Sequence, residues 1–179
     1  EDEVMKVIEA RANAVGARLV AFGRDYDAYE QNGRLVVQRE DRLLDLPLPA
    51  LVGRHQISNA GTAVAAALSL SAERPEIAID EAAIEQGLRN VEWPGRMQRL
   101  TAGPLPDVLG AEGELWLDGG HNPAAGDMLA ETLASLEDKA PKPTYLVVGM
   151  MGQKDALGFL APFRGLVRAV YTVPIPGAH

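Results

Sequence analysis

The chain has 179 residues, 47% of them hydrophobic, which suffices for one domain, or for one domain and part of another. Its formal net charge of −8 argues against a surface for nucleic acid or anionic membrane, because both of these partners are negatively charged. The absence of cysteine excludes disulfides and thiolate chemistry, and no stretch has the length of a transmembrane helix. These features suit a cytoplasmic protein.

Both ends of the chain have the character of internal segments. The first residue is not Met, and the acidic start Glu1–Glu3 is the opposite of a signal peptide. The last residues, Pro174–His179, follow directly after a strand-like run. We therefore expect the chain to be a fragment of a longer protein.

The first part of the chain predicts a helix followed by a small β region. Val4–Val15 carries apolar residues at helical spacing and stops at Gly16, a typical helix C-cap. The β region is expected to be antiparallel. Its predicted strands are Arg18–Phe22, Leu35–Gln38 and Leu43–Leu46.

Two helices are predicted after this β region. His55–Leu70 is rich in alanine, which indicates close packing against a sheet or another helix. Glu81–Asn90 has Asp80 as its expected N-cap and places Ile84 and Leu88 on one face.

The periodicity is interrupted at Trp93–Arg96, and we place a domain boundary there, between domains 1–93 and 94–179. The second domain alternates strand and helix, which predicts an α/β fold with a mostly parallel sheet. Its predicted strands are Gln98–Thr101, Leu115–Asp118, Tyr145–Val148 and Ala169–Val173, and its predicted helices are Pro123–Leu136 and Ala156–Phe163.

The most informative segment is Asp118–Pro123, a glycine turn between a strand and a helix. Asn122 is a good N-cap, and Pro123 fits the first helical position, where its missing N–H costs nothing. Asp118 then lies at the carboxyl end of a strand, where open α/β sheets bind ligands. The alternative is an ordinary loop in which Asp118 only caps the turn.

Two other groups of residues are candidates for a ligand site. His55 and Asn59 lie four apart on one helix face, and a carboxamide such as that of Asn59 matches the edge of an adenine. Arg96 stands on the short Trp93–Arg96 segment, from which it could reach a phosphate in an interdomain cleft. The alternatives are a buried, satisfied Asn59 and an interdomain ion pair of Arg96.

In order, these motifs resemble those of folylpolyglutamate synthase, including the bifunctional dihydrofolate synthase form, within the group of Mur-type peptide ligases. The resemblance rests on H-Q-x-x-N-A from His55, W-P-G-R-x-Q from Trp93, D-x-x-H-N-P from Asp118, and the segment ending in Lys154-Asp155. Gly23–Tyr26 is similar to an element of the folate branch and favours it over the cell-wall branch.

The resemblance implies the end of a P-loop-type central ATPase domain, followed by a Rossmann-like C-terminal domain. ATP would activate the substrate carboxylate as an acyl phosphate, which the amino group of L-glutamate attacks. By position, Asn59 would contact the adenine, Arg96 the phosphates, and Asp118 the ribose hydroxyls. His121 would lie near the phosphates or the incoming glutamate, and Lys154 and Asp155 would position a loop. The implied substrates are ATP, L-glutamate and dihydropteroate or a folate, and the implied state is a monomer.

The chain also departs from the family pattern. Gly120 stands where many relatives have Ala, and Gln153 stands where Asp is common. No G-x-x-x-x-G-K-[ST] loop is present, so the triphosphate cradle and the Mg²⁺ ligands are expected upstream. We therefore expect the chain alone to be inactive.

Three alternatives remain at this stage. The chain could come from a cell-wall ligase with a UDP-muramyl substrate. It could be a non-catalytic nucleotide-binding module, in which Arg96 does not affect turnover. It could also be a purely structural α/β domain.

Overall fold

The computed structural model describes residues 2–40 and 42–176, and within it the chain divides into two units. Unit 1 comprises the chain up to Pro49 together with Ile57–Asn90, and unit 2 comprises Ala50–Gln56 together with the chain from Val91 onward. The division thus falls shortly before the predicted boundary at Trp93–Arg96. The segment Ala50–Gln56 is grouped with unit 2, although it precedes most of the helical part of unit 1 in the sequence.

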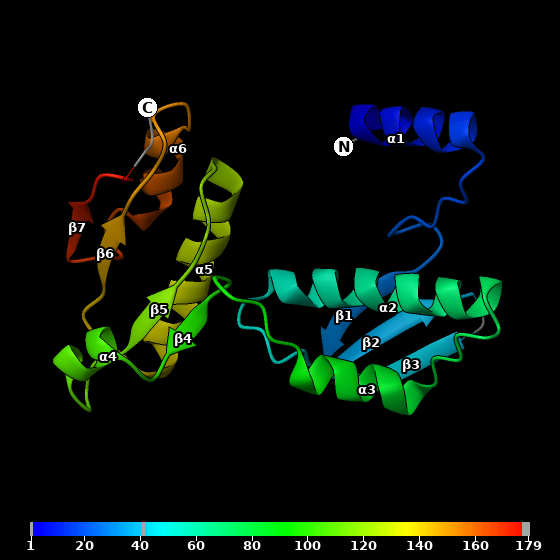
Figure 1. The fold of residues 1–179 in the computed structure, drawn as a ribbon, viewed down its shortest axis with the longest axis horizontal. Coiled ribbons are helices and arrows are strands. Elements are labelled where there is room, and N and C mark those ends of the chain that lie inside the picture. Colours follow the sequence, from blue (N-terminus) through cyan, green and yellow to red (C-terminus); the bar gives the residue numbers. More distant parts are fainter. Residues whose placement is uncertain (1, 41, 177–179) are drawn as a thin grey trace. The chain divides into compact units, whose positions relative to one another are not determined.

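Unit 1 contains a three-stranded antiparallel sheet in the order β1-β2-β3 (Figure 1). The strands are β1 (Asp27–Gln31), β2 (Arg34–Arg39) and β3 (Arg42–Pro47). Asn32 and Gly33 connect β1 to β2 with φ values of 52° and 72°, the positive values that a two-residue hairpin turn needs. The predicted antiparallel region is therefore confirmed, but β1 was missed.

The predicted strand Arg18–Phe22 is wrong. Only an isolated bridge joins Phe22 to Tyr26, because the chain turns back at Gly23, whose N–H donates to the Tyr26 carbonyl (2.8 Å). The Asp25 carboxylate holds this turn by accepting from the Ala21 N–H at 2.7 Å. The helix before it, α1 (Asp2–Val15), is confirmed.

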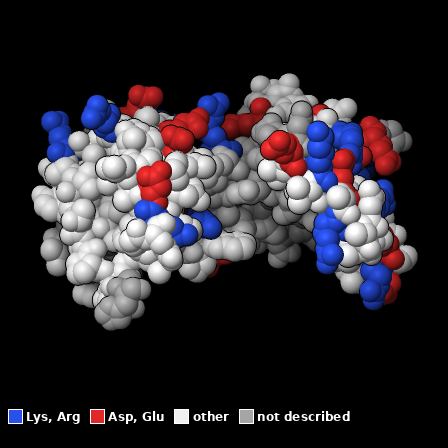
Figure 2. Space-filling model, turned by 90° about the horizontal axis from the view of Figure 1, so that it is seen from above, with Lys and Arg blue, Asp and Glu red and all other residues white. Residues whose placement is uncertain are grey.

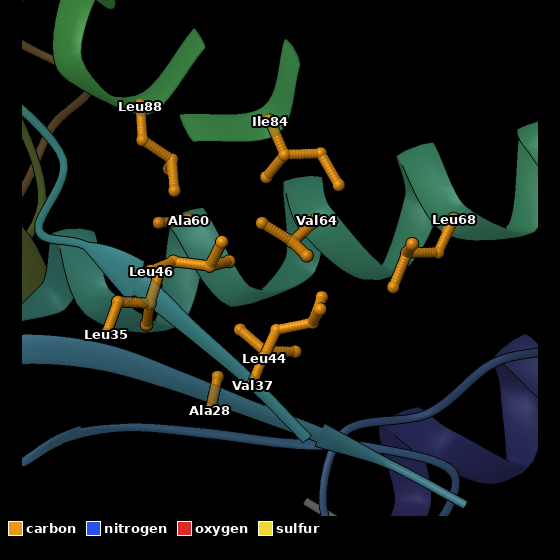
Figure 3. Close-up of a cluster of buried hydrophobic side chains, with 10 residues drawn as sticks. All are labelled: Ala28, Leu35, Val37, Leu44, Leu46, Ala60, Val64, Leu68, Ile84 and Leu88. Atoms are coloured by element: carbon orange, nitrogen blue, oxygen red, sulfur yellow. The ribbon is translucent and has the colours of Figure 1, made fainter. Parts of the chain in front are cut away.

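The core of unit 1 lies between one face of the sheet and two helices, α2 (His55–Glu73) and α3 (Glu81–Asn90). The predicted cap of α3 is confirmed, since Asp80 Oδ1 accepts from the Ala83 N–H at 2.7 Å. Figure 3 shows the buried cluster between these elements. It consists of Ala28, Leu35, Val37, Leu44 and Leu46 from the strands, Ala60, Val64 and Leu68 from α2, and Ile84 and Leu88 from α3.

Unit 2 alternates strands and helices, as its sequence predicts. Its elements are β4 (Gln98–Leu100), α4 (Pro104–Leu109), β5 (Leu115–Leu117), α5 (Pro123–Lys139), β6 (Tyr145–Val148), α6 (Ala156–Leu160), the 3-10 turn η1 (Ala161–Phe163) and β7 (Ala169–Thr172). The β6–β7 pair is parallel, as expected, but β4 and β5 form a separate antiparallel pair. The α/β class is confirmed, although the short helix α4 was not predicted.

Packing in unit 2 centres on α5. Ala130 on α5, Phe159 on α6 and Phe163 in η1 are buried together. Leu146 and Val148 of β6 pack against this cluster, so one face of the β6–β7 pair is covered by helices. This packing fixes the start of α5, and with it the turn that carries Asp118.

Within the described part of the chain, no helix has both the length and the apolar character needed to cross a bilayer. On the face shown in Figure 2, basic side chains lie among acidic ones.

Candidate functional site

Asp118 joins two loops of unit 2. Its Oδ1 accepts from the Gly120 N–H at 2.7 Å, and its Oδ2 accepts from the Met97 N–H at 2.8 Å. A third bond runs beside these, from the Gly119 N–H to the Gly95 carbonyl (2.8 Å). The sequence therefore correctly placed Asp118 at the end of a strand, and the structure adds that it ties the 118–120 turn to the 95–97 turn.

These bonds leave Asp118 able to bind a further donor. A carboxylate offers about four acceptor positions, and the two backbone N–H groups use one on each oxygen. The side chain is half-buried, so it remains accessible to a hydroxyl from a ligand.

Arg96 lies next to this junction. Its N–H donates to the Trp93 carbonyl (3.3 Å), which closes a turn, and Gly95 has a φ of 70° that favours glycine. A Cβ placed on Gly119 would lie 3.8 Å from Arg96 Nη1, so the guanidinium is close to the Asp118 turn. Arg96 is exposed, and no carboxylate of the described residues forms an ion pair with it.

His121 and Asn122 start α5 at the same turn. Asn122 Oδ1 accepts from the Ala125 N–H at 2.9 Å, which confirms the predicted N-cap with Pro123 in the first turn. His121 Nδ1 lies 2.9 Å from the Gly119 carbonyl. Because a carbonyl can only accept, Nδ1 is the donor in this contact.

The segment ending in Lys154-Asp155 lies beside the start of α5. Asp155 Oδ1 caps α6 by accepting from the Gly158 N–H at 2.8 Å. A Cβ on Gly158 would lie 2.8 Å from Pro123 Cγ, so α6 packs closely against the first turn of α5. Asp155 therefore caps the helix that packs against the start of α5.

The 50–56 segment also belongs to this region of unit 2. Arg54 pairs with Glu131 of α5 at 3.0 Å. Burial lowers the pKa of His55, and the charges of Asp118 and Arg96 shift this pKa in opposite directions. The sequence pointed to His55 only through its spacing from Asn59, and nothing local linked it to Asp118. Asn59 lies on α2 in unit 1, whereas Arg96, Asp118 and His121 lie in unit 2.

Gly120 has little free space around it. A Cβ at this position would lie 2.9 Å from Leu129 Cδ1 and 3.1 Å from Asp118 Oδ1. An alanine here would therefore require Leu129 to move.

A separate cavity of about 400 Å³ lies between β4 and α4 and contains none of the candidate residues. Glu114 at its edge accepts from Lys142 Nζ (2.9 Å) and from Trp116 Nε1 (3.2 Å). The bond from Lys142 is the main cause of a lowered pKa for this carboxyl, followed by the bond from Trp116. No sequence pattern indicated this cavity, because α4 was not predicted.

No acidic or histidine cluster in the described ranges could hold a metal ion, since three such side chains do not come together there.

Comparison with known proteins gives consistent relatives, although no family model matches the chain. A probable bifunctional folylpolyglutamate synthase/dihydropteroate synthase of Haloferax volcanii is 34% identical over 153 residues, covering 86% of this chain and 16% of the relative. The folylpolyglutamate synthase of Lacticaseibacillus casei is 27% identical over 177 residues, which cover 96% of this chain and 38% of the relative. The chain thus spans well under half of the length of these relatives.

Solved structures of proteins with the same names resemble the fold of this chain. The folylpolyglutamate synthase of Thermotoga maritima matches 98% of this chain and 39% of its own, with a TM-score of 0.70 and 26% identity. E. coli FolC, in a complex with DHPP and ADP, matches 96% of this chain and 37% of its own, with a TM-score of 0.71 and 28% identity. In sequence and in fold, the chain corresponds to the C-terminal portion of the folylpolyglutamate synthase/dihydrofolate synthase family.

Proposed function

We propose that this chain is the C-terminal part of an ATP-dependent ligase that adds L-glutamate to dihydropteroate, to folates, or to both. The observation that carries the proposal is the Asp118 junction, which ties the 95–97 turn that carries Arg96 to the 118–120 turn that precedes His121. Folate-branch relatives support this choice over the cell-wall branch. Under this proposal, unit 1 is the end of the central ATPase domain and unit 2 is the C-terminal Rossmann-like domain.

Arg96 supplies the charge that phosphoryl transfer needs. Its guanidinium is exposed and close to the Asp118 turn, and the fork of N–H groups matches phosphate oxygens. Such a group stabilises the negative charge that develops as a phosphoryl group moves to the substrate carboxylate. Asp118 then binds the ribose hydroxyls with its remaining acceptor positions, and Asn59 contacts the adenine.

His121 serves the second half of the reaction. The glutamate amine attacks the carbonyl carbon of the acyl phosphate, the new C–N bond forms, and phosphate leaves with the electron pair of the broken C–O bond. The nitrogen must lose a proton in this step. With Nδ1 donating to the Gly119 carbonyl, Nε2 of His121 is the ring nitrogen left to take that proton.

Mg²⁺ completes the proposal, but its ligands are expected in the preceding part of the polypeptide. When bound, the ion would neutralise the charge of the ATP phosphates. The enzyme is proposed to act as a cytoplasmic monomer that binds neither nucleic acid nor membrane.

The test is ADP release by the complete polypeptide that contains this chain, with Mg-ATP and L-glutamate. Dihydropteroate, tetrahydrofolate and a UDP-muramyl precursor are offered in separate reactions. Turnover on either pterin is the expected result, and turnover on both makes the enzyme bifunctional. Turnover on the muramyl compound alone would move the function to cell-wall synthesis. The 179-residue chain by itself should release no ADP.

A further inference from the structure

Arg96 stands between two residues whose backbone is in the left-handed region. Gly95 has a φ of 70°, which glycine adopts freely, whereas Met97 has a φ of 40°, which is uncommon for a residue with a side chain. Such a conformation costs free energy and persists only where the surrounding structure holds it. The turn that presents Arg96 therefore needs particular contacts to keep its shape.

The 118–120 turn supplies two of these contacts. The Met97 N–H donates to Asp118 Oδ2 at 2.8 Å, and the Gly119 N–H donates to the Gly95 carbonyl at 2.8 Å. Met97 is also buried, with only 5% of its surface exposed. These contacts hold the backbone on both sides of Arg96, but they do not involve the Gly95 N–H.

The side chain of Gln98, the last residue of the W-P-G-R-x-Q motif, binds that remaining group. Its Oε1 accepts from the Gly95 N–H at 3.0 Å. Because an N–H can only donate, the oxygen of the amide faces Gly95. Gln98 is the first residue of β4 and pairs with Leu117 of β5, so its backbone is fixed by the sheet. An amide oxygen that reaches back three residues from this strand closes the turn around Arg96.

We propose that Gln98 is a positioning residue for Arg96, whose turn it holds in the shape that keeps the guanidinium beside the Asp118 turn. The place of the guanidinium follows from the 3.8 Å between Arg96 Nη1 and a Cβ placed on Gly119. A charge held in advance stabilises developing charge without the cost of reorganisation during the reaction. The inference rests on the proposed function, because it assigns Arg96 to phosphoryl transfer. Gln98 itself needs no contact with the nucleotide.

Gln98→Met tests the proposal in the complete polypeptide, because it removes the acceptor oxygen and keeps the length of the side chain. The kcat for glutamate ligation should fall by about three- to tenfold, the change in population expected from the loss of one hydrogen bond. The dissociation constant of ATP, measured by equilibrium binding, should change by less than about twofold, because Arg96 is proposed to act on charge that develops later. Gln86→Met, the same change at an exposed position of α3, is the matched control and should alter neither value.

A double substitution separates positioning of Arg96 from general support of the fold. Once Arg96→Ala has removed the guanidinium, Gln98 has nothing left to position, so adding Gln98→Met should lower kcat no further. A residue that acts only through stability would lower the activity of Arg96→Ala by the same factor as that of the wild type. Hydrogen exchange of a peptide covering residues 93–98 gives a second readout. Its exchange should be faster in Gln98→Met than in Gln86→Met, because the Gly95 N–H has lost its acceptor.

Equal kcat values for Gln98→Met and Gln86→Met would overturn the inference, as would a further loss of kcat in the Arg96→Ala background. A loss of ATP affinity as large as the loss of kcat would also overturn it, because Gln98 would then support the nucleotide site as a whole. A wild-type polypeptide that ligates no glutamate would overturn the proposed function instead. The exchange of residues 93–98 would then still decide whether Gln98 holds the turn.

Discussion

Asp118 has two tasks at the scale of single residues, and they can be tested separately. One is structural, because its carboxylate accepts from the Met97 and Gly120 N–H groups and so holds two turns together. The other is the proposed contact with the ribose. A substitution that removes the charge but keeps the shape affects both tasks, so stability and nucleotide affinity must both be measured.

Asp118→Asn should lower the free energy of unfolding of unit 2 by about 1–3 kcal/mol, because an amide nitrogen cannot accept and one backbone N–H loses its partner. The KM for ATP should rise in the complete enzyme. Asp127→Asn, an equivalent change at an exposed position of α5, is the control for urea unfolding. If both variants unfold alike, the structural role is wrong. If the wild type uses 2′-deoxy-ATP as well as ATP, the ribose contact is wrong.

Arg96→Ala should reduce kcat much more than it weakens ATP binding, because the guanidinium is proposed to act on charge that develops during phosphoryl transfer. We expect a loss of at least about a hundredfold in kcat, the usual effect of removing one such donor. Steady-state kinetics together with equilibrium binding of ATP separate the two parameters. Unchanged turnover would remove Arg96 from the catalytic machinery.

At the scale of elements, the close approach of α2 to β1 depends on the absence of a side chain at Gly61. A Cβ on Gly61 of α2 would collide with the Cβ of Ala28 on β1. The alanine-rich sequence of this helix correctly predicts close packing, and Gly61 marks where the approach is closest. The helix is therefore held near the sheet at the cost of a residue with poor helix propensity.

Gly61→Ala should destabilise unit 1 by about 1–3 kcal/mol, since an added methyl group in a packed interface forces the backbone to shift. Gly87→Ala in α3 is the matched comparison, because nothing lies within 4 Å of its Cβ position. That change should stabilise unit 1 by about 0.5–1 kcal/mol through helix propensity alone. Thermal unfolding of both variants measures the two changes in stability. If both substitutions change the stability in the same direction, the close packing of α2 on β1 is wrong.

The helices and strands also show which parts of the fold could be predicted from the sequence. The caps at Asp80 and Asn122 were predictable, since capping is local chemistry within a few residues. Strand β1 was missed because polar residues obscure its alternation, although the Asn32-Gly33 pair is a strong hairpin signal. The predicted strand Arg18–Phe22 failed for the opposite reason, because its apolar run has no neighbouring strand to pair with.

The candidate site was only partly predictable. Asp118, Arg96 and His121 were identified from motifs, and the strand-turn-helix pattern explains why Asp118 lies where it does. The bond from Met97 to Asp118 spans 21 residues, and the pairing of Arg54 with Glu131 spans 77. Contacts over such separations depend on tertiary packing, which leaves no periodic pattern in the sequence.

At the scale of the whole molecule, each unit has its own buried cluster. The unit 1 cluster includes Leu46, which is 0% exposed, and the unit 2 cluster includes Phe163, which is 2% exposed. Separate cores allow separate unfolding, because cooperativity requires shared buried surface.

Leu46→Ala should therefore destabilise unit 1 by about 2–5 kcal/mol, and Phe163→Ala should destabilise unit 2 by about 3–5 kcal/mol. Hydrogen exchange followed by mass spectrometry resolves the two units by their peptides. Leu46→Ala should speed exchange in Leu35–Arg39 and leave Tyr145–Val148 unchanged, with the reverse for Phe163→Ala. If either variant speeds exchange in both segments, the units unfold as one.

The discontinuity of unit 2 has a practical consequence for dissecting this protein. A cut at Val91 would separate the second unit from Ala50–Gln56, and with it from the Arg54 partner of Glu131 and from His55. The excised piece would expose the α5 surface that those residues cover. An isolated unit 2 that keeps these contacts would need the seven-residue segment Ala50–Gln56 joined to it by a short engineered linker. The domain is therefore built from two separate stretches of the sequence.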